Sequence, residues 1–485
     1  MLENEVKTQK FVLKLFTEIM IKGSSTRRQM VSQLYNNLLN ILRRVSKDID
    51  VKKFSDKLEV LTPIDYVDSV RQILLDTPGI DFVLEATQFN QMNTLDDIKV
   101  AVNNVMGKEI VGKSFVVKCK RTGTHPFTSM DIERAVGGYM LANNESRGVS
   151  LKSFDIKINI ELVHHQLYIV TKKHDGLSGF PMGTQGSILS LMSGGFDSTV
   201  ASYLMMRRGI KTNFVFFNLG GVAHEIGVKQ VAYYLWQKFG SSHRITLTSV
   251  PFEEVVTEIF KSTHETYMGV TLKRLMLMAS EKIANDMKIE AIVTGEAIGQ
   301  VSSQTLRNLA LIDQATSKLV LRPLCSMNKP EIMQTAQDIG TKHFAEAMPE
   351  YCGVISKNPV THGSYERMEK EAARFDYSVL EDAIKNAKVV NVDEIDKDIQ
   401  EIGQLEVVDT VNENCVVVDI RQSEDCIKAD CETRKIPFYR LKSEIKNLPE
   451  GKDILLYCEK GILSQLHGQF LRDSENYKNI KVYRP

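Results

Sequence analysis

Long hydrophobic runs are missing from this sequence of 485 residues. No apolar stretch approaches the roughly 20 residues that a membrane-spanning helix needs. The first residues, MLENEVKTQKFVLKLF, are charged throughout and lack the hydrophobic region of a secretory signal. Cysteine is scarce, with seven residues spread thinly along the chain, which argues for a reducing compartment. We therefore expect a cytoplasmic protein with no membrane partner.

An excess of charge of either sign is also missing, because 61 Lys and Arg residues balance 61 Asp and Glu residues. Overall charge therefore does not indicate a nucleic-acid partner, although local patches can still bind nucleic acid. Basic residues exceed acidic ones within residues 1–50, whereas residues 365–400 lean acidic. Internal repeats and low-complexity tracts are absent. A chain of this length predicts roughly three or four domains.

The spacing of apolar residues divides the chain into several α/β parts. From about residue 60 to 170, short strand and helix patterns alternate as in a compact α+β unit, and a Gly-rich stretch follows at 174–186. From 187 to about 345, apolar strands alternate regularly with helices, which predicts a parallel sheet covered by helices on both faces. Residues 364–400 predict an acidic, helical connector. The last part, 404–485, again has a βα pattern.

The stretch LSLMSGGFDSTVASYL joins a buried strand to a helix through the loop Ser193–Ser198. The loop matches neither GxxxxGK[ST] nor GxGxxG. Its two glycines permit a tight turn that presents N–H groups to an anion, and the helix N-terminus adds a positive dipole end. Asp197 is a carboxylate of the kind that holds Mg²⁺ against phosphate. On these residues alone, a tight turn that merely needs glycine remains the alternative.

In the stretch DILLYCEKGILSQLHG, an apolar run delivers Cys458 into a short polar loop ahead of a helix. Backbone N–H groups of about residues 459–463 are expected to point at its sulfur and to stabilise a thiolate or persulfide. Free cysteine is most often a small buried hydrophobe. We keep that interpretation for Cys119, Cys325, Cys415, Cys426 and Cys431. Zinc is disfavoured, because no CxxC or nearby His accompanies these thiols.

The loop SGGFDS at the end of the first strand of the βα alternation resembles the PP-loop ATP pyrophosphatase family. The stretches FTEIMIKGSSTRRQM, LKRLMLMASEKIA, TGEAIGQVSSQTL and MPEYCGVISKNPVTH resemble the tRNA 4-thiouridine synthetases over essentially the whole chain, which ends in VYRP. Within it, FVVKCKRTGTHPFTSMDIERAVGGYML resembles a THUMP domain, and NCVVVDIR with the LLYC loop resembles a rhodanese domain.

This resemblance implies a multidomain α/β fold. Residues 1–60 would form a ferredoxin-like domain and 61–173 a THUMP RNA-binding domain, both α+β. Residues 174–363 would form a PP-loop ATP pyrophosphatase domain with a doubly wound parallel sheet, similar to the adenine nucleotide alpha hydrolases. An acidic connector, 364–403, would lead to a rhodanese α/β domain at 404–485.

The implied activity is that of a tRNA sulfurtransferase. ATP, with Mg²⁺, would convert O4 of uridine 8 in tRNA into an adenylate, and persulfide sulfur would replace that oxygen to give 4-thiouridine. The resemblance also implies a cysteine desulfurase as sulfur donor and a sulfur supply to the sulfur carrier protein of thiamine thiazole synthesis. The resemblance also allows a homodimer, because members of this family often dimerise. The alternatives are another PP-loop ligase, which adenylates a carboxylate to make an amide, and a non-catalytic tRNA-binding or sulfur-relay protein.

The same resemblance implies the residues of the nucleotide site. They are Leu191, Met192, Ser193, Gly194, Gly195, Phe196, Asp197, Ser198, Lys273, Gly295 and Gln304. Lys273 would reach a phosphate, where an ammonium can neutralise charge that develops in the transition state. On spacing alone, Lys273 is better described as part of a solvated helix face, and Gln304 as a polar residue at a helix start. Arg307 lies near this site in the sequence and receives no role.

The resemblance assigns a further set of basic residues to tRNA, read more by shape than by sequence. They are Lys22, Arg27, Arg28, Lys118, Lys120, Arg121, His125 and Arg134. Without the resemblance, such charges are most simply a solvated surface. His164 and His165 are predicted to lie in a strand with a structural role.

For the sulfur steps, the resemblance implies that Cys458 carries the persulfide. Its terminal sulfur attacks C4 of the uracil, or leaves as sulfide that does so. Cys352 would then form a disulfide with Cys458, which a reductant opens for turnover. The rhodanese loop usually offers an arginine, and Lys460 stands there instead, which keeps the positive charge but loses the bidentate fork.

Overall fold

The structure is a computed structural model of the chain. It describes residues 8–219, 221–348, 358–395, 405–421, 425–437, 440–441, 444–449, 451–458, 464, 467–468, 471–472 and 477–485. Cys352 and Lys460 lie outside the described residues. The chain divides into two compact units, Met1–Thr184 with Arg207–Gly209 and Gln185–Met206 with Ile210–Pro485.

The first unit is built on one eight-stranded sheet with the order β2-β3-β1-β4-β8-β7-β5-β6. Its strands are β1 Thr8–Leu15, β2 Asp50–Lys53, β3 Lys57–Pro63, β4 Ile80–Phe89, β5 Ser114–Thr122, β6 Gly148–Val149, β7 Ile156–Val163 and β8 Gln166–Asp175. Its helices are α1 Thr17–Met20, α2 Ser24–Leu42, α3 Val67–Leu75, α4 Leu95–Met106 and α5 Ser129–Asn143, with 3₁₀ turns η1 Ile64–Tyr66 and η2 Lys108–Ile110. β5 pairs in parallel with β6 and β7, and the other pairs of this sheet are antiparallel.

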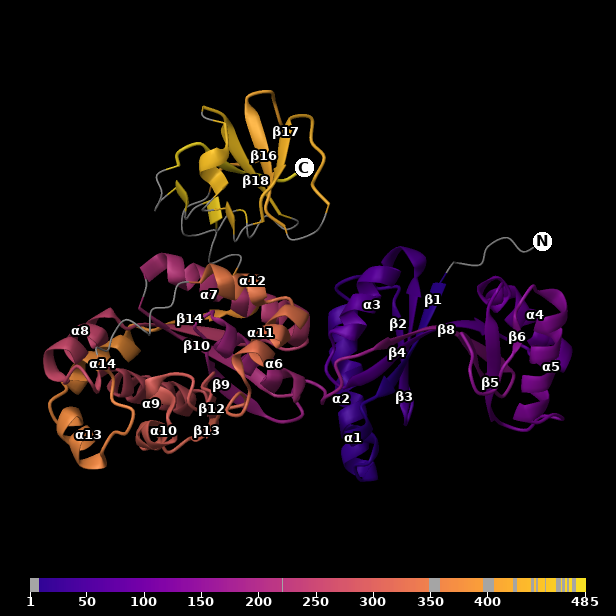
Figure 1. The fold of residues 1–485 in the computed structure, drawn as a ribbon, viewed down its shortest axis with the longest axis horizontal. Helices are drawn as coiled ribbons and strands as arrows, with labels where there is room; N and C mark the ends of the chain where they lie inside the picture. The colour runs from indigo at the N-terminus through magenta and orange to yellow at the C-terminus, as the bar shows by residue number, and fades with distance from the viewer. Residues whose placement is uncertain are drawn as a thin grey trace. The chain divides into compact units, whose positions relative to one another are not determined.

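Two hydrophobic cores lie against this sheet. The first joins residues of β1, α2, β3, α3 and β4, and the second joins α4 and α5 to β5, β7 and β8. Figure 1 shows α2 and α3 beside β1–β4, and α4 and α5 beside β5 and β6. The expected domain boundary at residues 60–61 falls inside β3, whose side chains belong to the first core. The change from one core to the next comes after β4, because α4 begins the second.

Capping boxes set the starts of α4 and α5. Thr94 and Thr128 each accept a hydrogen bond from the backbone N–H three residues on, and the Asp97 and Asp131 carboxylates bond back to the N-cap N–H. Each box satisfies helix donors that would otherwise lack partners.

β7 and β8 form a hairpin whose two-residue turn is His164–His165. The prediction that this pair lies in a strand is therefore wrong. His164 has φ +54°, a left-handed conformation that favours Gly or Asn over other residues. The sequence has neither Gly nor Asn at this position. The alternation of apolar residues therefore predicted one continuous strand with no turn.

The Gly-rich stretch at 174–186 packs on the first unit through its central residues. Phe180 is 4% exposed and contacts Ile19 and Met30, and Asn37 Nδ2 donates to the Met182 carbonyl at 3.0 Å. These buried contacts keep the stretch on α1 and α2 as far as Thr184, where the first unit ends.

The second unit contains a six-stranded sheet with the order β13-β12-β9-β10-β11-β14. Its strands are β9 Ser187–Leu191, β10 Lys211–Asn218, β11 Thr246–Pro251, β12 Ala291–Val293, β13 Leu319–Leu321 and β14 Lys388–Asn391. Its helices are α6 Phe196–Arg207, α7 Gly221–Leu235, α8 Glu253–Ser262, α9 Met268–Asp286, α10 Leu306–Asp313, α11 Lys329–Asp338, α12 Lys342–Ala347, α13 Tyr365–Ala372 and α14 Tyr377–Lys385. Short turns are η3 Trp236–Gly240, η4 Ser302–Gln304 and η6 Val392–Glu394. β9–β13 are mutually parallel and β14 is antiparallel. Helices α7 and α9 lie on opposite sides of the sheet (Figure 1), so the predicted doubly covered parallel sheet is confirmed.

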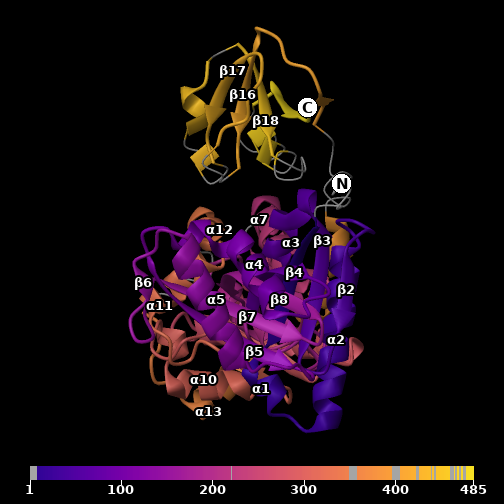
Figure 2. The same ribbon diagram turned by 90° about the vertical axis from the view of Figure 1, so that its right-hand side faces the viewer.

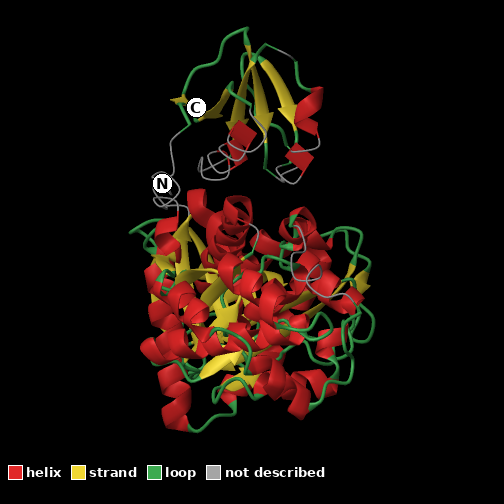
Figure 3. Cartoon of the chain, turned by 90° about the vertical axis from the view of Figure 1, so that its left-hand side faces the viewer, coloured by secondary structure: helices red, strands yellow, loops and turns green. Residues whose placement is uncertain are grey.

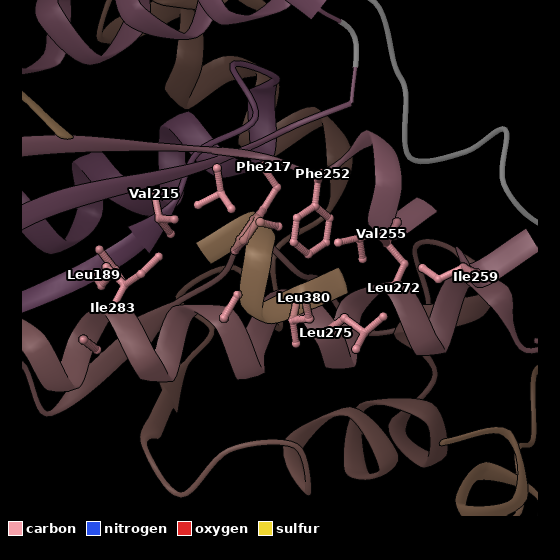
Figure 4. Close-up of a cluster of buried hydrophobic side chains, with 14 of the residues drawn as sticks. Leu189, Val215, Phe217, Phe252, Val255, Ile259, Leu272, Leu275, Ile283 and Leu380 are labelled. Carbon is pink, nitrogen blue, oxygen red and sulfur yellow. The ribbon is translucent and has the colours of Figure 1, made fainter. Parts of the chain in front are cut away.

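The largest core of this sheet lies between its strands and helices α8, α9 and α14. Leu189, Val215 and Phe217 from the strands face Leu275 of α9 and Leu380 of α14 (Figure 4). Each strand contributes consecutive or near-consecutive apolar residues, as expected where both faces of a sheet are buried.

Residues 364–395, which were expected to form a connector, are instead packed into this body. Leu380 and Ala383 of α14 are buried in the core, and β14 pairs with β11. The buried Glu371 carboxylate accepts a hydrogen bond from the His264 N–H at 2.9 Å. The acidic composition favoured an exposed connector. Each short helix nevertheless has apolar residues at helical spacing on one face, which is enough to pack the helix against the sheet.

The last part of the chain forms a five-stranded sheet with the order β15-β19-β18-β16-β17, in which all pairs are parallel. Its strands are β15 Val407–Val408, β16 Cys415–Asp419, β17 Glu432–Lys435, β18 Asp453–Tyr457 and β19 Ile480–Tyr483, with the 3₁₀ turn η7 Ile445–Asn447. Figure 2 labels β16, β17 and β18 side by side, and Figure 3 shows the strands of this sheet in yellow. Val417, Leu455 and Tyr483 lie in its core. The two stretches expected to be strands, NCVVVDIR and DILLYC, contain β16 and β18.

Candidate active site

A cavity of about 550 Å³ opens in the second unit at the carboxyl ends of β9, β10 and β12. This edge of a parallel sheet is where ligands of open α/β folds bind. The cavity is lined by Leu191, Met192, Ser193, Gly195, Phe196, Asp197, Ser198, Lys273, Gly295 and Gln304, every expected nucleotide residue except Gly194. Gly194 lies in the same loop with φ +81°, and a Cβ there would come within 2.4 Å of Met348 Cε. The fold therefore brings three distant stretches of sequence to one cavity.

The loop between β9 and α6 is closed by its two serines. Ser198 Oγ accepts a hydrogen bond from the Ser193 N–H at 3.1 Å, and the two hydroxyl oxygens are also 3.1 Å apart. His224 Nε2 lies 3.1 Å from the Ser193 carbonyl oxygen, which accepts its hydrogen. Burial lowers the pKa of His224, so the ring is neutral at pH 7. These bonds fix the loop with α6 beginning directly behind it, which suits an anion.

Asp197, at the start of α6, is held by two side chains that the sequence did not suggest. Lys329 Nζ lies 2.8 Å from its Oδ1, and Gln300 Nε2 donates to its Oδ2 at 2.9 Å. Both side chains line the cavity. Lys329 adds a second cation beside the loop, and Asp197 balances its charge.

Lys273 belongs to a chain of charges along the cavity wall. Its Nζ lies 2.7 Å from Glu296 Oε1, while Arg322 Nε and Thr294 Oγ1 donate to Glu296 Oε2 at 2.9 and 3.0 Å. Arg322 also pairs with Asp313 at 2.5 Å. Burial opposes ionisation of Glu296, but Lys273 and Arg322 outweigh it and hold the pKa of Glu296 below its ordinary value. Glu296 is therefore a carboxylate at neutral pH.

Gly295 and Gln304 shape the same wall from the segment after β12. A Cβ on Gly295 would lie 2.6 Å from Asp197 C and from Ser198 N, so the glycine permits contact with the start of α6. Gln304 Oε1 accepts a hydrogen bond from the Ala297 N–H at 3.4 Å and is buried. The glycine at this strand end thus serves a backbone-to-backbone contact.

Sequence reasoning missed Glu296, Gln300, Lys329 and His224 in this cavity. Glu296 follows β12 by three residues, and the rule that ligands bind at carboxyl strand ends could have found it. Lys329 starts α11 and is 132 residues from Asp197, so it carried no local signal. Arg307 is outside the cavity lining: its Nε donates to the Gly363 carbonyl at 2.9 Å, and its guanidinium stacks 4.1 Å from the Tyr365 ring centre.

The residues present fit a Mg²⁺ that arrives with a nucleotide. Across the described part of the chain, no three His, Cys, Asp or Glu side chains gather as a metal site. Mg²⁺ is usually held by one or two carboxylates together with substrate phosphates. Asp197 offers such a carboxylate at the mouth of the phosphate loop.

The basic residues expected to bind tRNA lie on elements of both hydrophobic cores of the first unit. Lys22 and Arg28 are exposed at α1–α2, and Arg27 Nη1 donates to the Met20 carbonyl. Lys120 is exposed on β5 and Arg134 is exposed on α5. These positions give separate basic groups along one unit.

A bonded cluster orders the end of β5. Arg121 Nη1 lies 3.0 Å from His125 Nδ1 and donates to the Gly123 carbonyl, and His125 Nε2 donates to the His164 carbonyl. Lys118 Nζ lies 3.4 Å from a Glu133 carboxylate oxygen. Arg121 and His125 are therefore partly engaged inside the protein.

Cys458 directly follows β18 and is 4% exposed. The Ser464 N–H points at its sulfur, with N and Sγ 3.4 Å apart. Among the other thiols, Cys415 is buried as expected, and burial raises the pKa of Cys119 to about 12. Cys325 is exposed, so its assignment as a buried hydrophobe is wrong. It lies in a turn after β13.

The fold and the cavity define a PP-loop type of nucleotide-binding domain, joined in one chain to a THUMP type of domain. The family model for the THUMP domain matches residues 92–172, and the model for Thiamine biosynthesis protein (ThiI) matches residues 183–377. A tRNA sulfurtransferase from Pseudomonas putida is 44% identical over 484 residues, covering 98% of this chain and 100% of the relative. A tRNA sulfurtransferase from Azotobacter vinelandii is 45% identical over 487 residues with the same coverage. The chain belongs to the tRNA sulfurtransferase family.

A solved structure agrees with this fold. The crystal structure of a 4-thiouridine synthetase–RNA complex with bound ATP matches with a TM-score of 0.71 at 24% identity, covering 79% of this chain and 100% of that chain. Among the described helices, none has the length and apolar character to cross a membrane.

Proposed function

We propose that this chain uses ATP to convert O4 of uridine 8 in tRNA into an adenylate, and then replaces that oxygen with sulfur to give 4-thiouridine. One observation carries the proposal: residues of the SGGFDS loop, Asp197 among them, line a single cavity with Lys273 at the carboxyl edge of a parallel sheet. Loop N–H groups and the start of α6 suit the pyrophosphate part of ATP. The related synthetase solved with RNA and ATP supports both substrates.

The adenylation step forms a bond between uracil O4 and the α-phosphorus, and breaks the bond from that phosphorus to the departing pyrophosphate. Negative charge grows on the bridging and equatorial oxygens as this happens. We assign the neutralisation of this charge to Lys273 and Lys329, whose side chains both line the cavity. Mg²⁺ held by Asp197 would share that charge. Oxygen attached to AMP leaves far more readily than the oxygen of a carbonyl.

The sulfur step uses Cys458 in a rhodanese-like domain. A cysteine desulfurase loads a sulfane sulfur onto Cys458, and the terminal sulfur forms a bond to C4 as AMP leaves. Cys352 attacks the Cys458 sulfur, which breaks the remaining sulfur–sulfur bond, releases the thiocarbonyl and leaves a Cys352–Cys458 disulfide. A dithiol reductant then restores both thiols. The Ser464 N–H aimed at the Cys458 sulfur supports stabilisation of an anionic sulfur.

We assign the basic side chains of the first unit to the tRNA phosphates, chiefly the exposed Lys22, Arg28, Lys118, Lys120 and Arg134. The same persulfide chemistry would let the protein pass sulfur to the carrier protein of thiamine thiazole synthesis, a role consistent with the matching family model. Both tasks place the protein in the cytoplasm, where tRNA and reductant are available.

The test is formation of 4-thiouridine in tRNA from ATP, Mg²⁺ and a persulfide source, followed by mass analysis of nucleosides. Asp197→Ala should abolish thiolation and tRNA-dependent release of pyrophosphate. Cys458→Ser should abolish thiolation but leave pyrophosphate release intact. Cys352→Ser should stop with the tRNA joined to Cys458 through a disulfide, so that little free 4-thiouridine forms. Cys325→Ser, which changes an exposed thiol, is the matched control and should behave as the parent protein. Full thiolation by Asp197→Ala would overturn the adenylation proposal, and full multiple turnover by either of the other two would overturn the sulfur scheme.

A further inference from the structure

We propose that Glu296 is a positioning residue for adenylation: it holds the Lys273 ammonium at the phosphate end of the cavity, and Arg322 supplies the cation that keeps this group of three charges positive. The inference rests on the proposed function, in that Lys273 is taken to meet a phosphate of ATP. It assigns tasks to two residues that no sequence pattern singled out.

Each carboxylate oxygen of Glu296 has its own cationic partner. Oε1 lies 2.7 Å from Lys273 Nζ, and Oε2 accepts a hydrogen bond from Arg322 Nε at 2.9 Å. The Glu296 side chain is 8% exposed and lines the cavity together with Lys273. Arg322, with 11% side-chain exposure, approaches from the end of β13. Lysine on a long helix would otherwise sample many rotamers, and the buried carboxylate restricts it to one.

Arg322 is needed because of the net charge beside the phosphate site. A Lys273–Glu296 pair alone is neutral and would offer little attraction to a phosphate a few ångströms away. With Arg322 the group contains two cations and one anion, a net charge of +1. Asp313, the other partner of Arg322, is 45% exposed and therefore screened by solvent. Glu296 can thus orient Lys273 without cancelling the positive field at the loop.

A purely structural ion pair is the competing explanation, because Glu296 also ties α9 to the ends of β12 and β13. The two explanations differ in how mutations combine. If Glu296 acts through Lys273, replacing Glu296 has no further effect on the rate once Lys273 has been replaced. If Glu296 is only a structural tie, its effect and that of Lys273 are independent, and the two losses of rate multiply.

The experiment is a double-mutant cycle with Glu296→Gln, Lys273→Met and the double variant. Two quantities are measured: the Kd for ATP by equilibrium dialysis without tRNA, and the thiolation rate at saturating ATP. Lys273→Met should lower the rate by about 100-fold and Glu296→Gln by about 10-fold or more. The double variant should be no worse than Lys273→Met in either measurement. Multiplying effects would overturn the inference.

Glu296→Asp guards against a variant that fails to fold. The shorter side chain keeps a carboxylate for Arg322 but withdraws it from Lys273, so the rate should fall while the thermal midpoint stays near that of the parent. A parental rate would overturn the inference. Glu281→Gln is the matched control, because Glu281 lies on α9, the helix that carries Lys273, and accepts hydrogen bonds from Ser317 away from the cavity. It should leave Kd and rate unchanged.

Arg322→Gln separates the two tasks, since it removes a cation while Lys273 stays bound to Glu296. ATP affinity should fall several-fold, and unchanged affinity would overturn the role of Arg322.

If the parent protein binds ATP but makes no thionucleoside, the proposed function is wrong, and the double-mutant cycle measured by dialysis still tests the inference. If the parent makes thionucleoside and the cycle is multiplicative, the inference falls alone. A parent that binds no ATP would overturn both.

Discussion

The Cα of Gly295 lies against the backbone nitrogen of Ser198, so closely that a Cβ on Gly295 would come within 2.6 Å of that atom. The segment after β12 thereby touches the peptide that opens α6. Any displacement of Gly295 is passed to the loop that we assign to the phosphates. The contact joins two stretches that lie almost one hundred residues apart and makes them one wall of the cavity.

Gly295→Ala should therefore damage the loop directly. The methyl group meets backbone atoms, which cannot rotate away, so we expect at least tenfold weaker ATP binding and a loss of about 1–3 kcal/mol in unfolding free energy. Dialysis and urea unfolding measure the two effects. Gly138→Ala is the control, because Gly138 lies in α5 with no heavy atom within 4 Å of the added Cβ. It should leave ATP binding unchanged and raise stability by about 0.5–1 kcal/mol. Parental ATP affinity in Gly295→Ala would contradict the contact.

Leu380→Ala tests whether the acidic segment is part of the folded body. Leu380 is 4% exposed in the core shared with α8 and α9, so truncation should cost about 2–5 kcal/mol of unfolding free energy. Leu306→Ala makes the same chemical change at a side chain that is 71% exposed, and should cost less than about 1 kcal/mol. Urea unfolding followed by circular dichroism provides the comparison. Equal small losses would mean that α14 does not pack on the sheet.

The sequence predicted the parallel sheet well because residues 187–345 alternate strand and helix patterns with little interruption. It also predicted that the SGGFDS loop stands at a carboxyl strand end, where the cavity lies. It could not predict that Lys329 reaches Asp197, since that contact depends on how α11 folds back across the sheet. Local composition misled at 364–395, where charged residues stand between the apolar residues that dock the helices.

Arg307 is expected to stabilise the fold without taking part in ATP binding. Its hydrogen bond to Gly363 and its stacking on Tyr365 connect α10 to the start of α13, outside the cavity lining. Arg307→Met should lower the unfolding free energy by about 1–2 kcal/mol, because the Gly363 carbonyl and the ring both lose a partner. The Kd for ATP should stay within about twofold of the parent. A large loss of ATP affinity with unchanged stability would instead assign Arg307 to the site.

His343 should make stability depend on pH below neutrality. Burial lowers its pKa from 6.5 to about 4, so between these values the folded ring stays neutral while the unfolded ring is protonated. The unfolded state then binds more protons, and the unfolding free energy should fall as pH decreases from about 6.5 to about 4. Between pH 7 and pH 5, His343 should account for about 1–2 kcal/mol. His343→Phe keeps the ring contact with Phe344 and should show a smaller drop in urea midpoint than the parent. His362→Phe, at an exposed position, should retain the parental drop, and an equal drop in both variants would refute the assignment.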